Sequence, residues 1–237
     1  LCRDWAHLGI SFNGTFAEYV AIPASAAHRL PDGVSYLEGA FLEPIAIIAH
    51  TLERLKVTPG DTAAVVGPGP LGLFHIQALR AAGVDKIVAV GQAGDDARLS
   101  VAARVGADAV VNCSLTDAVA AVREWTGGLG ADIVIEAGGT ASSVSSAIQM
   151  ARGNGQVAIV GFARESTINP LDIVRNDLLI VGIVGGLSRH AKRALRWMET
   201  GQVRAEPIVT HRLKLDSGDE GLRLARDLVA AKVVYEP

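Results

Sequence analysis

Three glycines at a fixed spacing are the strongest chemical signal in the sequence. Gly67, Gly69 and Gly72 form a G-x-G-x-x-G turn directly after a β-branched run at residues 62–66. The first glycine of such a turn permits a tight bend, the second removes a side chain that would block a pyrophosphate, and the third lets helix and strand pack closely. The helix that follows offers free N–H groups and a positive dipole end to phosphate. The sequence therefore predicts a dinucleotide site formed by Gly67, Gly69, Pro70, Leu71 and Gly72.

The segment about 20 positions further on bears on which dinucleotide is bound. An acidic residue at the end of the second strand binds the ribose hydroxyls of NAD in such sites. This sequence has Gly91 there, followed by Asp95, Asp96 and Arg98. Arg98 could pair with the 2′-phosphate of NADP, whereas the two aspartates would repel that phosphate or cap the next helix. The choice between NAD and NADP stays open, with Gly91 and Arg98 as candidate contacts.

The elements that must position this turn repeat one pattern between residues 62 and 184, a short apolar run followed by glycine and an amphipathic stretch. Alternating strands and crossover helices have this pattern, and nearly continuous apolar runs are typical of strands covered on both faces. Strands are predicted at residues 62–66, 86–90, 109–112, 132–136, 156–160 and 178–183. Helices are predicted at residues 71–82, 95–105, 117–126, 141–151 and 170–175. Right-handed crossovers then give a parallel, doubly wound six-stranded sheet of order 3-2-1-4-5-6.

Local signals mark the ends of these helices. Ser114 and Asp117 predict a capping box for the third helix. Gly83, Gly106 and Gly153 stand where helix C-terminal caps are expected.

The flanks do not share the repeating pattern. Residues 14–30 contain β-rich runs such as 16–20, and residues 35–55 predict a long helix or a pair of helices broken at Pro44. After Gly185 the sequence predicts, in order, a helix, a strand, a helix and a strand, at residues 189–199, 208–215, 218–230 and 232–235. We expect the two flanks to pack together as one incomplete domain, so that the chain divides at residues 1–57, 58–187 and 188–237.

Composition narrows the classes of function. A net charge of −3, with no run among the 22 basic residues, argues against a nucleic-acid partner. No apolar stretch approaches the ~20 residues of a membrane-spanning helix. Two cysteines, Cys2 and Cys113, do not suggest a disulfide scaffold, so we expect a cytoplasmic protein. The chain begins with Leu1 and lacks a secretory signal, and we expect the natural start to lie upstream.

Several short motifs follow one another in a fixed order along the chain. They are residues 14–20 (GTFAEYV), 30–35 (LPDGVS), 42–44 (LEP), 57–61 (VTPGD), the glycine turn, 106–108 (GAD), 132–138 (DIVIEAG) and 155–161 (GQVAIVG). Together they resemble the zinc-containing medium-chain dehydrogenases, and are most similar to the branch of sorbitol, threonine and related polyol dehydrogenases. The resemblance implies a Rossmann domain beside an incomplete GroES-like, β-rich catalytic domain. It also implies a homodimer or homotetramer in which zinc assists hydride transfer between a small alcohol or polyol and NAD or NADP.

The resemblance assigns roles to residues outside the glycine turn. Glu43 falls where the polyol branch has a glutamate beside the catalytic zinc, and its apolar neighbours predict a buried carboxylate that needs a cation. Cys2 fits the fourth cysteine of a lobe that binds a structural zinc. His50 and His75, in apolar helical stretches, are interpreted as core residues. The remaining predicted cofactor contacts are Ala137 and Gly138 near the adenosine, and Gly161, Phe162, Ile183 and Val184 near the nicotinamide.

Two alternatives differ in class from this interpretation. A zinc-independent quinone or enoyl reductase would share the sheet but lack Cys2 and the Glu43–Pro44 pair. A non-catalytic NAD(P)-binding module would need none of the family's other metal ligands, which lie in a region that precedes this chain.

Overall fold

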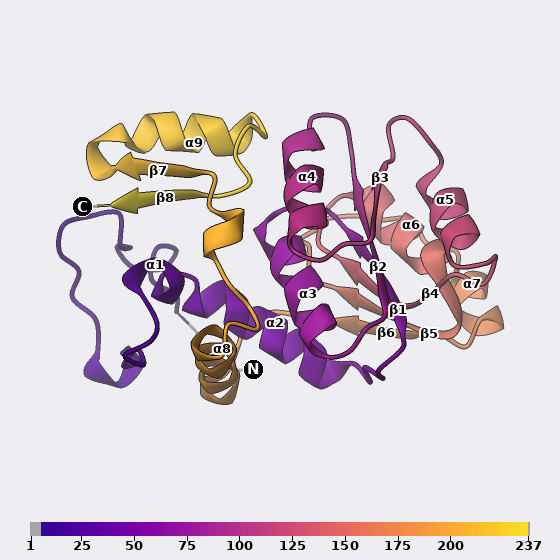
Figure 1. Cartoon of the computed structure of the whole chain (residues 1–237), viewed down its shortest axis with the longest axis horizontal. Coiled ribbons are helices and arrows are strands. Elements are labelled where there is room, and N and C mark those ends of the chain that lie inside the picture. Colours follow the sequence, from indigo (N-terminus) through magenta and orange to yellow (C-terminus); the bar gives the residue numbers. More distant parts are fainter. Residues whose placement is uncertain (1–5, 237) are drawn as a thin grey trace.

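A parallel sheet forms the centre of the structure, a computed structural model that describes residues 6–236 (Figure 1). Its six strands run in the order β3-β2-β1-β4-β5-β6, and every neighbouring pair is parallel. The strands are β1 (Thr62–Val66), β2 (Lys86–Gly91), β3 (Ala109–Asn112), β4 (Ala131–Glu136), β5 (Ala151–Ile159) and β6 (Leu179–Gly182). The predicted doubly wound Rossmann sheet is therefore confirmed in its order and direction.

Helices cover both faces of this sheet, and each face has its own hydrophobic core. Alternate residues of a strand point to opposite faces, so Ala63 and Val65 of β1 join one core while Ala64 and Val66 join the other. Each fully buried Val, Leu or Ile contributes about 1.5–3 kcal/mol, which fixes the register of the strands. The helices that follow β1 to β5 are α3 (Pro70–Ala81), α4 (Asp96–Arg104), α5 (Ala118–Trp125), α6 (Ala141–Met150) and α7 (Pro170–Arg175).

The flanking segments add a second layer at one end of the sheet (Figure 1). Helix α1 (Tyr36–Gly39) leads into α2 (Leu42–Arg54), which packs against α3 and α8 (Ser188–Glu199). Strands β7 (His211–Lys214) and β8 (Val233–Glu236) form a parallel pair connected by α9 (Gly218–Arg226). Three 3₁₀ turns complete the described elements, at Ala24–Ala26, Glu206–Ile208 and Leu215–Ser217.

Polar side chains of α1 and α3 hold the return segment, residues 203–230, by its main chain. Gln77 of α3 donates to the C=O of Arg204 (3.0 Å) and accepts from the N–H of the same residue (2.8 Å). The Glu38 carboxylate accepts from the N–H of Ala205 (2.6 Å). Because these bonds are half-buried and directional, they fix the place at which the chain returns to the flanking layer.

Two predicted helix ends are wrong. Asp117 is itself the N-cap of α5 and accepts from the N–H groups of Val119 and Ala120, so Ser114 takes no part in that cap. Gly153 lies inside β5, because α6 already ends at Met150. Gly83 and Gly106 do follow α3 and α4 with φ of +92° and +120°, the left-handed conformation expected after a helix.

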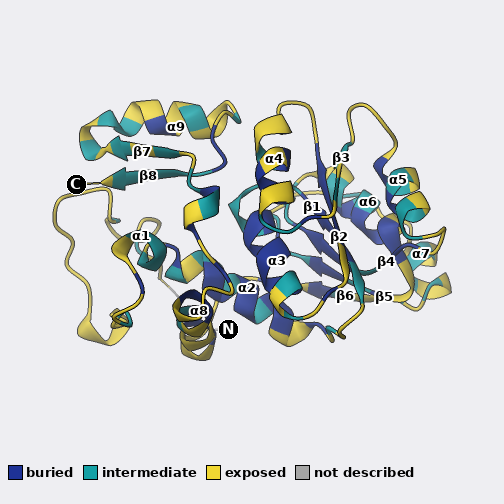
Figure 2. Ribbon diagram, in the orientation of Figure 1, coloured by how far each residue is buried: buried dark blue, intermediate teal, exposed yellow. Residues whose placement is uncertain are grey.

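The N-terminal flank also differs from its prediction. The helix pair at residues 35–55 is confirmed, but it is broken at residues 40–41, and Pro44 lies in the first turn of α2, where its missing N–H costs nothing. Residues 16–20 form no strand, since no neighbouring strand in the described chain pairs with them. Figure 2 shows the N-terminal flank as an exposed loop at the left, away from the buried central sheet. Within it, Phe16 and Tyr19 are 72% and 90% exposed.

None of the helices within residues 6–236 has the length and apolar composition needed to cross a membrane.

Candidate functional site

The carboxyl ends of five strands lie in one row along an edge of the sheet. Val66 of β1 pairs in register with Val90 of β2 and with Glu136 of β4. Glu136 pairs with Ile159 of β5, and Ile159 pairs with Gly182 of β6. The residues that follow these positions therefore emerge side by side at this edge, where doubly wound folds bind their ligands.

Each glycine of the turn has a separate structural reason. Gly67 has φ +93°, and a Cβ there would lie 2.5 Å from the amide nitrogen of Gly138. A Cβ on Gly72 would lie 2.1 Å from the carbonyl oxygen of Gly67, inside the strand–helix contact. Gly69 meets nothing within 4 Å, so its missing side chain leaves open space rather than a close contact. These are the three roles that a phosphate-binding turn requires of its glycines.

A cavity of about 550 Å³ opens at this turn. Its volume lies in the range of ligand sites. Gly69 is the N-cap of α3, so the positive end of the helix dipole and the free N–H groups of the first turn lie at the cavity. Six of the predicted cofactor contacts line it, namely Gly67, Gly69, Gly91, Arg98, Ala137 and Gly138. Pro70, Leu71 and Gly72 form the adjoining first turn of α3.

A buried ion pair closes the end of the cavity beyond β2. The side chains of Asp95 and Arg98 are 7% and 13% exposed, and their Oδ1 and Nη1 atoms lie 3.4 Å apart. Asp95 stands at the N-cap position of α4, but its carboxylate accepts from the N–H of Gln92 (3.1 Å) and caps no helical N–H. Arg98 also donates to the C=O of Ala230 (3.1 Å), in the return segment. The Arg98 charge is therefore already balanced and anchored, which the sequence did not show.

Glu136 supports the candidate site, and sequence reasoning missed it. It ends β4, is fully buried, and accepts through Oε1 from the N–H groups of Gly138 (2.9 Å) and Gly139 (2.7 Å) and from Ser143 Oγ (2.7 Å). Its Oε2 atom is buried without a partner in the described residues. The sequence did contain a signal, because Glu136 is an acidic residue that directly follows three apolar residues, 133–135, at the end of the predicted strand. Its carboxylate holds the loop at residues 137–139 against the glycine turn.

The predicted nicotinamide contacts lie further along the same row and outside the cavity. Gly161 follows β5, and a Cβ there would lie 2.4 Å from the amide nitrogen of Gly139. Phe162, next in the chain, is 83% exposed. Ile183 and Val184 follow β6, the first buried and the second 46% exposed. The structure thus brings these four residues to the edge of the sheet at which the cavity opens and does not gather them into the cavity.

The predicted metal residues do not form a site within the described chain. The prediction that Glu43 is buried is wrong, because it lies in the first turn of α2 on the side opposite the buried Ile45, Ile48 and Leu52. Residues 6–236 contain no group of three or more His, Cys, Asp or Glu side chains that could hold a metal ion. Cys2 lies outside the described residues. The residues present therefore do not by themselves make a zinc centre.

A doubly wound sheet with a glycine turn and a ligand-sized cavity at its carboxyl edge defines a dinucleotide-binding protein of the Rossmann class. Residues 70–200 match the family described as zinc-binding dehydrogenase. The chain belongs to this family, whose members carry out NAD(P)-dependent oxidoreduction of alcohols. The match favours the zinc-containing branch of the superfamily over its zinc-independent reductases.

Individual relatives agree with this assignment. The uncharacterised zinc-type alcohol dehydrogenase-like protein YdjL of Escherichia coli K12 is 35% identical over 98% of this chain and 69% of its own length. Sorbitol dehydrogenase of Halalkalibacterium halodurans is 31% identical over 100% of the chain and 69% of its own. A provisionally assigned zinc-binding dehydrogenase of Sinorhizobium meliloti 1021, solved with NADP bound, is 31% identical with a TM-score of 0.86, over 93% of this chain and 65% of that one. The chain thus spans about two thirds of the length of these relatives.

Proposed function

We propose that this chain is the dinucleotide-binding part of an alcohol or polyol dehydrogenase, which at the full length of its relatives moves a hydride between a secondary alcohol and NAD or NADP. The observation that carries the proposal is the cavity at the ends of β1, β2 and β4, where Gly69 leaves open space at the N-terminus of α3. A bound NAD(P)⁺ supplies the redox chemistry by accepting the hydride. The hydroxyl proton of the alcohol would pass to solvent, and the described residues bind and orient the cofactor.

Different residues at the carboxyl ends of the strands bind different parts of the cofactor. The N–H groups at the start of α3 hold the pyrophosphate, and Glu136 keeps the loop at residues 137–139 in contact with the turn. Gly91 and Arg98 lie on the side of the adenosine ribose, where Gly91 packs against the side chain of Leu99. The nicotinamide side is proposed to extend along Gly161, Phe162, Ile183 and Val184, which follow β5 and β6.

The metal assignment is a proposal for a protein of the relatives' full length. Glu43 has no hydrogen bond or ion pair among residues 6–236 and stands exposed at the start of α2, where a metal held by further ligands could reach it. Zinc takes three or four protein ligands, so neither Glu43 nor Cys2 is sufficient alone. We propose that residues 1–57 and 188–237 belong to the GroES-like catalytic domain and residues 58–187 to the Rossmann domain.

Partners and location follow from the same interpretation. Strand β6 is an edge of the sheet, and Leu179 and Val184 beside it are nearly half exposed, which supports a homodimer or homotetramer formed across this edge. The substrate is a small alcohol or polyol. The low cysteine content supports a cytoplasmic location.

Titration with NADH and NADPH, followed by nicotinamide fluorescence, tests the proposed site. We expect Gly69→Ala to weaken the binding of the preferred cofactor about 10-fold or more, because the new methyl group occupies open space at the pyrophosphate position. Its melting temperature should change little, since Gly69 has φ −71° and no close neighbour. Gly153→Ala, which also meets nothing within 4 Å, is the control. Failure of the unaltered chain to bind either cofactor would refute the proposal.

Asp95→Asn tests what sets the choice of cofactor. Asp95 now balances the charge of Arg98 beside the adenosine end of the cavity. Loss of the negative charge should raise the affinity for NADPH relative to NADH about 3- to 10-fold, because a 2′-phosphate would then meet a net positive pair. The ratio of the two dissociation constants is the measurement. An unchanged ratio would show that Arg98 serves only to anchor the return segment.

A further inference from the structure

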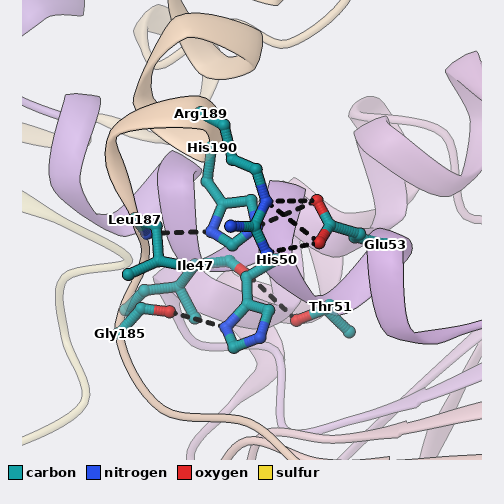
Figure 3. A network of polar contacts seen from close by, with 8 residues as sticks. All are labelled: Ile47, His50, Thr51, Glu53, Gly185, Leu187, Arg189 and His190. Carbon is teal, nitrogen blue, oxygen red and sulfur yellow. Dashed lines mark hydrogen bonds and ion pairs between the residues drawn. The ribbon is translucent and has the colours of Figure 1, made fainter. Parts of the chain in front are cut away.

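Two histidines hold the segment that follows β6, residues 183–187 (Figure 3). His50, on α2, donates its Nδ1–H to the carbonyl oxygen of Gly185 (2.9 Å). His190, in the first turn of α8, accepts through Nδ1 from the N–H of Leu187 (2.9 Å). The two rings stack with centroids 4.7 Å apart and planes inclined by 12°. One stacked pair thus holds the segment by its main chain at Gly185 and at Leu187.

Close packing adds to these hydrogen bonds. A Cβ on Gly186 would lie 3.0–3.1 Å from atoms of Ala46 on α2, so the segment lies directly on that helix. Gly185 has φ +58°, a conformation that turns the chain away from β6 at this place. Ile183 is held separately by its N–H, which donates to the C=O of Ile159 (2.9 Å). Val184 leads directly into the turn at Gly185, so its position depends on where the histidines hold the chain.

The hydrogen bonds require a neutral His190 ring. Its Nδ1 accepts from Leu187 while its Nε2–H donates to Glu53 (3.1 Å), so both ring nitrogens are used in one tautomer. A protonated ring would place an N–H against the N–H of Leu187 and break that bond. The Glu53 carboxylate is itself held by Arg189, whose hydrogen bonds lower the pKa of Glu53 to about 2.

The surroundings favour the neutral ring. The titratable or charged groups that face His190 are Glu53 and His50 from α2 and Arg189 from its own helix, and segment 183–187 carries none. Burial lowers the pKa of His190 below its ordinary value; the Glu53 carboxylate opposes this shift, and the neighbouring His50 and Arg189 reinforce it. At neutral pH the ring therefore accepts from Leu187.

We propose that His190 and His50 are positioning residues for the nicotinamide end of the cofactor site, because they hold residues 183–187 in place while the His190 ring is neutral. The inference rests on the proposed function, which places Ile183 and Val184 beside the nicotinamide. Acidification releases the bond from Leu187 and loosens the segment. Binding of the whole dinucleotide then weakens, whereas binding of its adenosine half, which lies at the cavity beyond β1 and β2, does not.

Calorimetric titration of the chain with NAD⁺ and with ADP-ribose, which lacks the nicotinamide, separates these two ends. NADP⁺ and 2′-phospho-ADP-ribose replace them if the chain prefers NADP. As the pH falls from about 8 through about 5.5, we expect the affinity for NAD⁺ to decrease relative to ADP-ribose, by about 3- to 10-fold once the His190 ring is fully protonated, the effect of losing one hydrogen bond. His190→Ala should show the weaker NAD⁺ binding at both pH values.

His190→Asn is the decisive variant. The asparagine Oδ1 can accept from the N–H of Leu187 as Nδ1 does, yet it does not titrate. We expect NAD⁺ binding close to that of the unaltered chain at about pH 8, and no selective loss at about pH 5.5. His28→Asn, at an exposed histidine of the N-terminal flank, should keep the original pH profile.

The outcomes distinguish this inference from the proposed function. Absence of binding of NAD⁺, NADP⁺ and both nicotinamide-free ligands would remove the proposed function and this inference with it. The positioning role alone would be overturned by either of two results obtained while the cofactor binds normally at about pH 8. One is that His190→Asn has the same pH profile as the unaltered chain; the other is that NAD⁺ and ADP-ribose lose equal affinity on acidification. If His190→Ala does not fold, the comparison of pH profiles between the unaltered chain and His190→Asn still tests the positioning role of His190.

Discussion

Gly72→Ala should destabilise the whole chain by about 3 kcal/mol and abolish cofactor binding with it. The new Cβ would lie 2.1 Å from the carbonyl oxygen of Gly67 and 3.3 Å from Cγ1 of Val65. The first of these is a backbone atom that cannot rotate away, so α3 must separate from β1. That contact joins the main helix of one face to the central strand of the sheet, and a loss of this size is a large share of the 5–15 kcal/mol typical of a folded domain.

Gly69→Ala provides the matched comparison, because it adds the same methyl group three residues earlier in the same turn. Urea unfolding should show a lowered midpoint for Gly72→Ala and an almost unchanged one for Gly69→Ala. Both variants should lose affinity for NAD(P)H. Equal midpoints would mean that the turn relaxes around the new Cβ, and that the close strand–helix contact is not needed for stability.

His75→Leu should make the chain resistant to acid. His75 is fully buried in α3, where it donates Nδ1–H to the carbonyl oxygen of Leu71 and leaves Nε2 without a partner in the described residues. Burial lowers its pKa from 6.5 to about 4. At about pH 7 the ring is neutral in both the folded and the unfolded chain, and the replacement should change the free energy of unfolding little.

The effect appears as the pH falls below 6.5, the value in the unfolded chain. In this range His75 is protonated in the unfolded chain and neutral in the folded chain. The free energy of unfolding therefore decreases until the pH reaches about 4. The loss from this residue is about 2 kcal/mol at about pH 5. We expect urea unfolding to show His75→Leu more stable than the unaltered chain by that amount at about pH 5. Parallel losses in both proteins would assign the acid sensitivity to other groups.

The sheet could be predicted from sequence because its signals are local and repeated. Each strand is a short apolar run, each strand but the last is followed by a helix-forming stretch, and the right-handed crossover then leaves few strand orders. The glycine turn was found for the same reason, since its residues lie within six positions of one another. The start of α5 shows the limit of such signals. The sequence pattern predicted Ser114 as the N-cap, whereas the N-cap in the structure is Asp117, three residues later.

Contacts between distant residues could not be predicted in this way. The stacked pair joins His50 and His190, which are 140 positions apart, and nothing near either residue indicates the other. Glu43 shows the opposite error. Its apolar neighbours indicated burial, but the covered face of α2 is the one that carries Ile45, Ile48 and Leu52, and only the packing of that helix against α3 and α8 decides which face is covered. Residues 16–20 have the pattern of a strand, and pairing depends on a partner that the pattern does not contain.

The return segment is held through its main chain, by Gln77 at Arg204, by Glu38 at Ala205 and by Arg98 at Ala230. Every amino acid offers the same carbonyl group, and every one except proline offers the same N–H. Evolution can therefore exchange the side chains of the return segment at these points without losing the attachment, whereas the three anchoring side chains must be kept. Among natural homologues, we expect residues 204, 205 and 230 to vary more than the anchoring residues 38, 77 and 98.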